Sequence, residues 1–356
     1  MIRVFVVDDS AFARRAISRV LGADPGIKVV GEAANGTEAL VRVPPTHPDI
    51  VTLDLAMPGM DGLATLRALL ARDPGLRVLM LSVHTRDGAE ATLEALAAGA
   101  VDFVDKSRFG LMEFDGLGRE LRERVTALAA GKSDGSGRGR NGAGRGERPP
   151  APPAGPSERL PLELCVLGAS TGGPAAIQVV LEALPAEFPL PLAIVQHMPP
   201  GFTGPFARRL DQRCRLRVRE AEDGDRLEPG RVLIAPAGFH MRVNGNLAVT
   251  LSPEPAEARH VPSVDVLMLS AARARPGRVL GVLLTGMGDD GADGMAAIHA
   301  QGGTTLAESE GTCVVYGMPR AAWDRGAVTH QLPLPALAEW MAGLTAASRG
   351  GASARR

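Results

Sequence analysis

The stretch Leu164–Ile177, LCVLGASTGGPAAI, runs from an apolar segment through a glycine-rich turn into the pattern of a helix. A short apolar run bounded by glycines is typical of a buried strand, and a strand followed directly by a helix is the unit of parallel α/β sheets. Functional side chains in such sheets lie at the carboxyl ends of the strands. The stretch therefore predicts an α/β fold and points to Ser170, which stands in the turn.

The same rhythm of strands and helices continues on the C-terminal side of this stretch. We expect a doubly wound α/β domain over residues 161–347, with a small antiparallel insertion at Arg231–Leu251 in which Asn244–Asn246 (NGN) forms a hairpin turn. The other expected elements are strands at Leu164–Leu167, Leu192–Val195, Val232–Ala235 and Val279–Leu284, and helices at Pro174–Leu184, Phe202–Leu210, Val264–Ala274 and Met295–Ala300.

The N-terminal part shows five strand-helix units of its own, over residues 1–125. This pattern predicts a five-stranded parallel sheet with the flavodoxin-like strand order, in which the first and third strands are neighbours. The expected strands are Ile2–Val7, Val29–Ala33, Ile50–Leu53, Val78–Leu81 and Phe103–Val104, and the expected helices are Ala11–Gly22, Thr37–Val43, Leu63–Arg72, Ala89–Ala98 and Arg119–Ala130.

Between the two patterned parts, residues 131–160 are rich in Gly, Arg, Ser and Pro and lack apolar periodicity. Such a segment cannot bury enough apolar surface to offset the entropy lost on ordering. We therefore expect a flexible linker over residues 126–160, and a disordered tail over residues 348–356.

Composition argues against several classes of protein. The net charge is −1 and the pI about 6.7, so the chain lacks the basic surface with which proteins bind nucleic acid or anionic membranes. Cys165, Cys214 and Cys313 form neither a disulfide framework nor a zinc motif. No signal peptide or membrane-spanning segment is recognisable, so we expect a cytoplasmic protein that does not insert into the membrane, and a monomer.

Acidic residues mark the strand ends of the N-terminal part. Asp8 and Asp9 end the first expected strand and Asp54 ends the third, so neighbouring strands bring three carboxylates together. A divalent cation offsets their mutual repulsion, and an all-oxygen ligand set suits Mg²⁺. Ser82 and Lys106 follow the fourth and fifth strands at the same edge, where they can stabilise a phosphoryl group carried by Asp54 as nucleophile.

With these residues the N-terminal part resembles a response-regulator receiver domain. The resemblance implies that Asp54 accepts a phosphoryl group from a histidine kinase. One position differs: Ser107 stands where the family usually has proline after the lysine. The implied roles are Mg²⁺ binding by Asp8, Asp9, Asp54 and the main-chain oxygen of Ala56, switching by Ser82 and Phe103, and phosphate contact by Lys106.

Two interpretations of Ser170 compete. A phosphate-binding loop requires G-x-G-x-x-G, or a lysine after the second glycine, and GASTGG has neither. The segment Gly168–Gly172 instead matches G-x-S-x-G, the turn that exposes a nucleophilic serine. This pattern often arises by chance, so it needs partners that provide a base and an acid.

Those partners stand at other strand ends. His197 ends the next expected strand, and the glycine-rich loop after Val279–Leu284 offers Asp289, Asp290 and Asp293. Three strand ends then supply Ser, His and Asp in that chain order, whereas α/β-hydrolases have the order Ser, Asp, His. The sequence thus predicts a catalytic triad outside the α/β-hydrolase fold.

The C-terminal part resembles the catalytic domain of chemotaxis protein-glutamate methylesterases, the CheB family. The resemblance rests on GASTGGP, QHMPPGFT, APAGFHM, HVPSVDVL, LTGMGDDGADGM and CVVYGMPRAA, which cover most of residues 163–345. It implies Ser170 as nucleophile, His197 as base and Asp290 as orienting acid, with Asp289 as the alternative. Met287 and backbone N–H groups near Thr171 are expected to bind the oxyanion.

The combined resemblance implies a phosphorylation-activated hydrolase. Its implied substrates are glutamate methyl esters on chemoreceptors, with deamidation of receptor glutamines as a second activity, and its implied role is sensory adaptation in chemotaxis. No cofactor is expected in the catalytic domain. Two alternatives remain at this point: a response regulator whose output is nucleic-acid binding, and a catalytically inactive scaffold.

Overall fold

The computed structural model describes residues 1–82, 86–106, 114–131, 161–255 and 258–353. The chain divides into two compact units, one formed by residues 1–130 with 198–206 and the other by residues 131–197 with 207–356. Each is described here by itself. Most of the expected linker, residues 132–160, lies outside the described residues.

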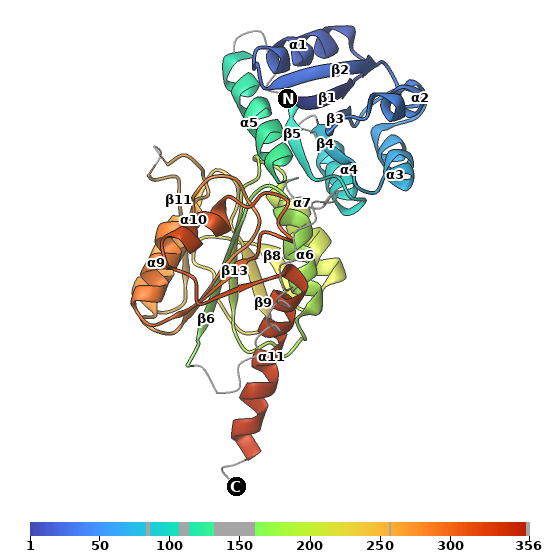
Figure 1. The fold of residues 1–356 in the computed structure, drawn as a ribbon. Helices are drawn as coiled ribbons and strands as arrows, with labels where there is room; N and C mark the ends of the chain where they lie inside the picture. The colour runs from blue at the N-terminus through green and yellow to red at the C-terminus, as the bar shows by residue number, and fades with distance from the viewer. Residues whose placement is uncertain (83–85, 107–113, 132–160, 256–257, 354–356) are drawn as a thin grey trace, which may run out of the picture. The chain divides into compact units, whose positions relative to one another are not determined.

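The first unit is a parallel five-stranded sheet in the order β2-β1-β3-β4-β5, as the sequence predicts. β1 pairs with β3, so the ends of these two strands are adjacent. Helices α1 and α5 contact each other on one face of the sheet, and α2, α3 and α4 cover the other (Figure 1). The strands are β1 Ile2–Val7, β2 Ile27–Ala33, β3 Ile50–Asp54, β4 Arg77–Ser82 and β5 Asp102–Asp105. The helices are α1 Ala11–Gly22, α2 Gly36–Thr46, α3 Gly62–Arg72, α4 Arg86–Ala97 and α5 Phe114–Ala130.

Side-chain caps fix where several of these helices begin. Ser10, Asn35 and Asp61 each accept a hydrogen bond from the backbone N–H three residues later, which satisfies a donor that the helix cannot pair. Each capping residue lies between the end of a strand and the start of the next helix, so the caps fix the loops at the sheet edge where Asp8, Asp9 and Asp54 lie.

The second unit is a seven-stranded parallel sheet in the order β14-β13-β12-β6-β7-β9-β8, with a separate antiparallel hairpin of β10 and β11. β6 lies at the centre, between β7 and β12. The strands are β6 Leu164–Ala169, β7 Leu192–Gln196, β8 Arg217–Glu220, β9 Arg231–Ile234, β10 His240–Val243, β11 Val249–Ser252, β12 Val279–Leu283, β13 Thr304–Glu308 and β14 His330–Leu332. The α/β class and the antiparallel insertion are confirmed.

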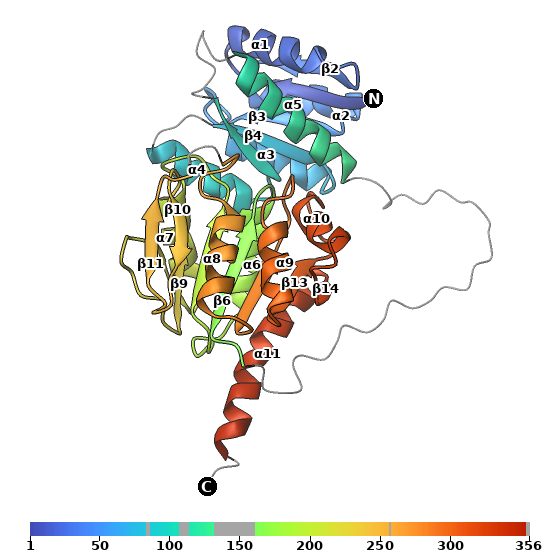
Figure 2. The same cartoon turned by 90° about the vertical axis from the view of Figure 1, so that its left-hand side faces the viewer.

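Helices cover both faces of this sheet. α9 and α10 lie on one face, and α6 and α7 lie on the other (Figures 1 and 2). The helices are α6 Gly173–Ala183, α7 Thr203–Arg213, α8 Val264–Ala274, α9 Ala292–Ala300, α10 Met318–Asp324 and α11 Leu334–Ser353.

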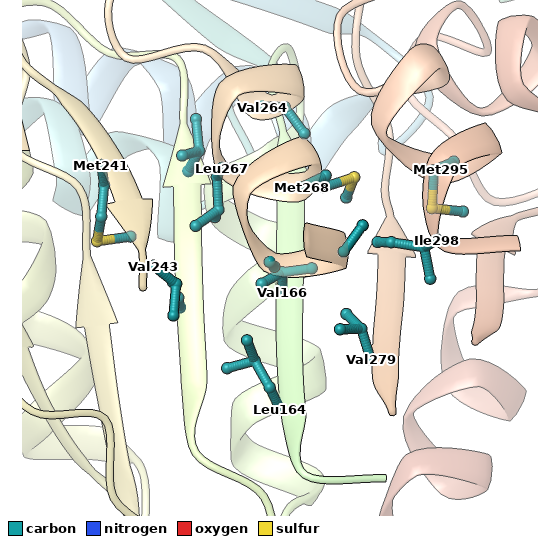
Figure 3. Packing of buried hydrophobic residues seen from close by; sticks show 14 of the residues in the cluster. Leu164, Val166, Met241, Val243, Val264, Leu267, Met268, Val279, Met295 and Ile298 are labelled. Atoms are coloured by element: carbon teal, nitrogen blue, oxygen red, sulfur yellow. The ribbon is translucent and has the colours of Figure 1, made fainter. Parts of the chain in front are cut away.

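The face that carries α8 is closed by apolar side chains from the sheet, the helix and the hairpin. Figure 3 shows Val264, Leu267 and Met268 of α8 packed over Leu164 and Val166 of β6. Each fully buried aliphatic side chain of this kind stabilises the fold by about 1.5–3 kcal/mol. This packing holds the N-terminus of α8 near the end of β6.

Several expected boundaries are wrong. Arg231–Ile234 pairs in parallel with β7, so the antiparallel insertion begins at His240 rather than Arg231. α5 continues to Ala130 and α11 to Ser353, so the starts of the expected linker and of the expected tail are helical. For α5 the end at Ala130 agrees with the helix expected at Arg119–Ala130, where alanine and leucine are strong helix formers. The last residues of α11, SRGGAS, include two glycines, and helix propensity does not explain why that helix continues. The elements β8, β13, β14 and α10 were not predicted, because their short segments carry little periodicity. α11 was also missed, although its buried residues Leu337, Met341 and Leu344 recur at helical spacing.

Candidate active site and phosphorylation site

The turn around Ser170 has the predicted strand-to-helix geometry. β6 ends at Ala169 and α6 begins at Gly173. Gly172 has φ +78°, and an added Cβ there would lie 2.6 Å from Val314, so the turn requires glycine at this position. The Ser170 N–H donates to the Thr285 carbonyl at the end of β12 (3.0 Å), which ties the turn to the neighbouring strand.

His197 occupies the equivalent place on the adjacent strand. β6 and β7 pair in parallel with Ala169 opposite Gln196, so Ser170 and His197 are the first residues beyond the paired segments. The His197 Nε2 atom lies 2.8 Å from Asp290 Oδ2. Within the described part of the chain, the second ring nitrogen, Nδ1, is buried and has no hydrogen-bond partner. No hydrogen bond joins Ser170 Oγ to the ring among the described residues.

Asp290 is held rigidly at the N-terminus of α8. Its Oδ1 accepts from Ser263 Oγ (2.8 Å) and from the Asp265 N–H (2.9 Å), and its Oδ2 accepts from the Val264 N–H (2.7 Å). Burial alone would raise the pKa of Asp290, but the hydrogen bond and charge of His197 and the backbone donors outweigh burial and lower it. The positive end of the α8 dipole acts in the same direction. Asp290 is therefore an ionised, fixed acceptor for the His197 ring.

The structure distinguishes Asp290 from the alternative acid, Asp289. The Asp289 side chain is 67% exposed and faces Arg325, whose Nη2 lies 3.6 Å from Asp289 Oδ2. Asp293 is also exposed and pairs with the same arginine. Of the three aspartates in the loop, Asp290 is the one in contact with His197.

Two backbone donors remain at the predicted oxyanion site. The N–H groups of Thr171 and Met287 donate no hydrogen bond within the described segments. Thr171 is buried, and its carbonyl accepts from Thr285 Oγ1 at 2.9 Å. Because Thr171 immediately precedes the N-terminus of α6, its N–H lies where the helix dipole favours negative charge.

Two further residues surround the contact between His197 and Asp290, and the sequence analysis gave neither of them a role at this site. His260 stacks on His197, with ring centroids 4.1 Å apart and an interplanar angle of 16°. Ser263 caps α8 and also binds Asp290. The stretch HVPSVDVL drew attention as a family motif. A serine before an apolar helical pattern is an N-cap signal, but nothing local to it indicates a contact with residue 290.

In the first unit, the three predicted carboxylates meet at one place. Oxygen atoms of Asp8, Asp9 and Asp54 lie within 4.8 Å of one another, and Asp8 and Asp54 are buried. Lys106 Nζ lies 3.1 Å from Asp8 Oδ2 and 2.5 Å from Asp54 Oδ2. Burial raises the pKa of Asp54 above its usual range, although Lys106 opposes this shift. The donor set contains only oxygen, which fits Mg²⁺.

The remaining receiver residues lie on β4, on β5 and in the loop after β3. Ser82 is buried at the end of β4 and its Oγ accepts from Thr92 Oγ1 at 2.6 Å, while Phe103 is buried in β5. The Ala56 N–H lies 3.4 Å from Asp54 Oδ1, which places Ala56 in the loop directly after the acid. Ser107 lies outside the described residues.

Comparison with known families separates the two units in the same way. Residues 165–341 match the family model of the CheB methylesterase, and residues 4–110 match that of the response regulator receiver domain. A protein-glutamate methylesterase/protein-glutamine glutaminase of Oleidesulfovibrio alaskensis is 45% identical, covering 92% of this chain and 94% of the relative. The chain belongs to the CheB methylesterase family.

Further comparisons agree with this membership. A protein-glutamate methylesterase/protein-glutamine glutaminase of Symbiobacterium thermophilum is 44% identical, over 95% of both chains. The crystal structure of the Thermotoga maritima CheB methylesterase catalytic domain has 40% sequence identity and a TM-score of 0.50, covering 51% of this chain and 98% of that one. This CheB-family chain is therefore an ester hydrolase joined to a receiver domain, that is, a response regulator with an enzymatic output. Among its described helices, none has the length and apolar character needed to cross a bilayer.

Proposed function

We propose that this CheB-family chain hydrolyses glutamate methyl esters on methyl-accepting chemoreceptors, with Ser170, His197 and Asp290 as its catalytic triad. The observation that carries the proposal is the 2.8 Å contact between His197 Nε2 and Asp290 Oδ2, on the strand next to Ser170. The names of the relatives supply the ester and amide substrates, and the resemblance to chemotaxis methylesterases supplies the receptor.

The protonation state of His197 follows from its neighbour. An ionised carboxylate only accepts hydrogen bonds, so the proton of neutral His197 is on Nε2, facing Asp290. Nδ1 then carries the lone pair and is the atom that acts as base. Nδ1 removes the Ser170 hydroxyl proton as Oγ attacks the ester carbonyl, and the Asp290 carboxylate stabilises the imidazolium that forms.

The two half-reactions then follow from the same groups. The tetrahedral oxyanion is stabilised by the N–H groups of Thr171 and Met287, and its collapse breaks the bond to methoxide, which takes the proton from His197 and leaves as methanol. His197 next deprotonates water, which attacks the acyl-serine; collapse of this second intermediate breaks the bond to Ser170 Oγ, which takes the proton back from His197 as the glutamate side chain is released. A glutamine amide reacts by the same steps with ammonia as leaving group, which makes deamidation the slower reaction.

The direct test measures methanol released from receptor methylated at glutamate, with unmethylated receptor as the matched control. We expect release that is proportional to the protein and to the methyl groups present. A purified, folded protein that releases no methanol from any methylated receptor would contradict the proposal.

We also propose that phosphorylation of Asp54, by a histidine kinase of the chemotaxis pathway, activates the hydrolase. Mg²⁺ held by Asp8, Asp9, Asp54 and the main-chain oxygen of Ala56 would neutralise charge on the phosphoryl group. Lys106 would contact that group, and Ser82 and Phe103 would respond to it. The support is the meeting of three carboxylates and one ammonium at the end of β1 and β3.

Substitution of Asp54 by asparagine tests this activation. We expect a small phosphodonor with Mg²⁺ to raise methanol release by the unsubstituted protein, and the ratio of stimulated to unstimulated release to fall to 1 in Asp54→Asn, because the amide cannot accept a stable phosphoryl group. Asp24→Asn is the matched control, since Asp24 lies between α1 and β2 at the opposite end of the strands. Stimulation retained in Asp54→Asn would refute Asp54 as the acceptor.

A further inference from the structure

We propose that Gln196 is a positioning residue for the catalytic pair: its side-chain amide holds the main chains of Ser170 and His197 at the spacing that proton transfer requires. The proposal rests on the function proposed above for these two residues. Gln196 is the last residue of β7 and is 2% exposed, so its side chain is enclosed by the protein.

The main evidence is that one side-chain nitrogen of Gln196 binds the carbonyl groups of both Ser170 and His197. Gln196 Nε2 donates to the Ser170 carbonyl oxygen (2.9 Å) and to the His197 carbonyl oxygen (3.1 Å). An amide nitrogen has two N–H groups, and both are used. Two acceptors facing one side-chain atom also identify that atom as the nitrogen, since the amide oxygen would be repelled by both carbonyls.

The two hydrogen bonds of Gln196 lie just beyond the last paired residues of β6 and β7. The pairing of β6 with β7 ends at Ala169 opposite Gln196, and the His197 N–H makes the last cross-strand bond, to the Ala169 carbonyl at 3.1 Å. Beyond this point the two strands turn apart, toward α6 and toward the loop after β7. Gln196 therefore joins the nucleophile and the base across the gap that the sheet itself leaves open.

Two further features show that the site is built around this side chain. Its Oε1 atom is buried and has no hydrogen-bond partner among the described residues, a cost that an apolar side chain of similar volume would avoid. An added Cβ on Gly173 would lie 2.0 Å from that oxygen, so the first residue of α6 leaves room for the amide. The cost of leaving Gln196 Oε1 without a partner is thus offset by the two hydrogen bonds that Gln196 Nε2 donates.

The test compares Gln196→Met, which keeps the volume without donors, and Gln196→Glu, whose carboxyl group can donate to at most one of the two carbonyls, and only when protonated. We expect kcat for methanol release to fall about 10- to 100-fold in both, the size of effect that a small misplacement of reacting groups produces, with KM changed less than about threefold because Gln196 does not touch the substrate. The rate of Ser170 labelling by a small organophosphonate should fall in parallel. Gln212→Glu, on the exposed face of α7, is the control and should match the unsubstituted protein.

The possible results distinguish a failure of the Gln196 proposal from a failure of the proposed function. Unchanged kcat and labelling in Gln196→Met, in a protein that otherwise releases methanol, would overturn the positioning role and leave the proposed function intact. Loss of kcat accompanied by a proportional rise in KM, or shown only by protein that is partly unfolded at the assay temperature, would also overturn it, since that pattern indicates general disorder. A modestly lowered midpoint is expected, because Gln196→Met removes two buried hydrogen bonds. Absence of methanol release from the unsubstituted protein would refute the proposed function, and labelling rates would then decide on Gln196 separately.

Discussion

Replacement of Ser170 by alanine is expected to lower methanol release from methylated receptor by at least about 10³-fold, because the covalent route through an acyl-serine is then closed. The Ala169–Gly173 turn should survive the change. Its geometry depends on the positive φ of Gly172 and on the bond from the residue 170 N–H to the Thr285 carbonyl, and neither involves the hydroxyl. The variant should therefore be folded, stable and inactive.

Two measurements check this expectation together. Methanol release gives the loss of turnover, and labelling with a fluorophosphonate probe reports the nucleophile itself, which should be labelled in the unsubstituted protein and unlabelled in Ser170→Ala. Ser252→Ala is the matched control, since Ser252 lies on the hairpin strand β11 and its hydroxyl accepts from the Glu254 N–H. Undiminished turnover in Ser170→Ala would exclude Ser170 as the nucleophile. Absence of labelling and of turnover in every variant would instead favour an inactive scaffold.

The parts of the site that sequence could predict are those that follow strand ends. A parallel sheet places the carboxyl ends of its strands at one edge, so Ser170 after β6 and His197 after β7 fall together once the strands are recognised. The same reasoning brings Asp54 beside Asp8 in the first unit. Long apolar runs and clear turns carry this information locally, and the structure agrees with it.

The parts that sequence could not predict depend on contacts between distant segments. The resemblance preferred Asp290 over Asp289, but nothing local to the loop explains that preference: it depends on the N-terminus of α8, whose backbone N–H groups receive the Asp290 carboxylate. The stacking of His260 on His197 and the Gln196 bridge likewise join residues whose local patterns are ordinary. Periodicity identifies elements, whereas the packing of α8 and the hairpin against β6 determines which side chains meet.

Replacement of Asp290 by asparagine is expected to lower kcat by about 10³- to 10⁴-fold, close to the loss expected for the nucleophile itself. If the amide nitrogen takes the Oδ2 position, it cannot accept from His197 Nε2–H, so the ring must adopt the other tautomer and the amide also faces the Val264 N–H. If the amide turns so that its oxygen accepts from His197, its nitrogen faces the Asp265 N–H instead. In either arrangement His197 Nδ1 no longer presents its lone pair opposite an anion that stabilises the imidazolium. Asparagine also removes the negative charge at the start of α8, which should destabilise the fold by about 1 kcal/mol.

Asp289→Asn is the matched control, because it makes the same chemical change one residue away on a side chain that faces Arg325. We expect its turnover to stay within about twofold of the unsubstituted protein, since an exposed ion pair contributes little. Turnover on methylated receptor and thermal unfolding, measured on both variants, separate catalysis from folding: a midpoint lowered by a few degrees cannot account for a loss of three orders of magnitude. If Asp289→Asn lost turnover and Asp290→Asn kept it, the acid of the triad would be Asp289, and the contact of Asp290 with His197 would serve only to fix the start of α8.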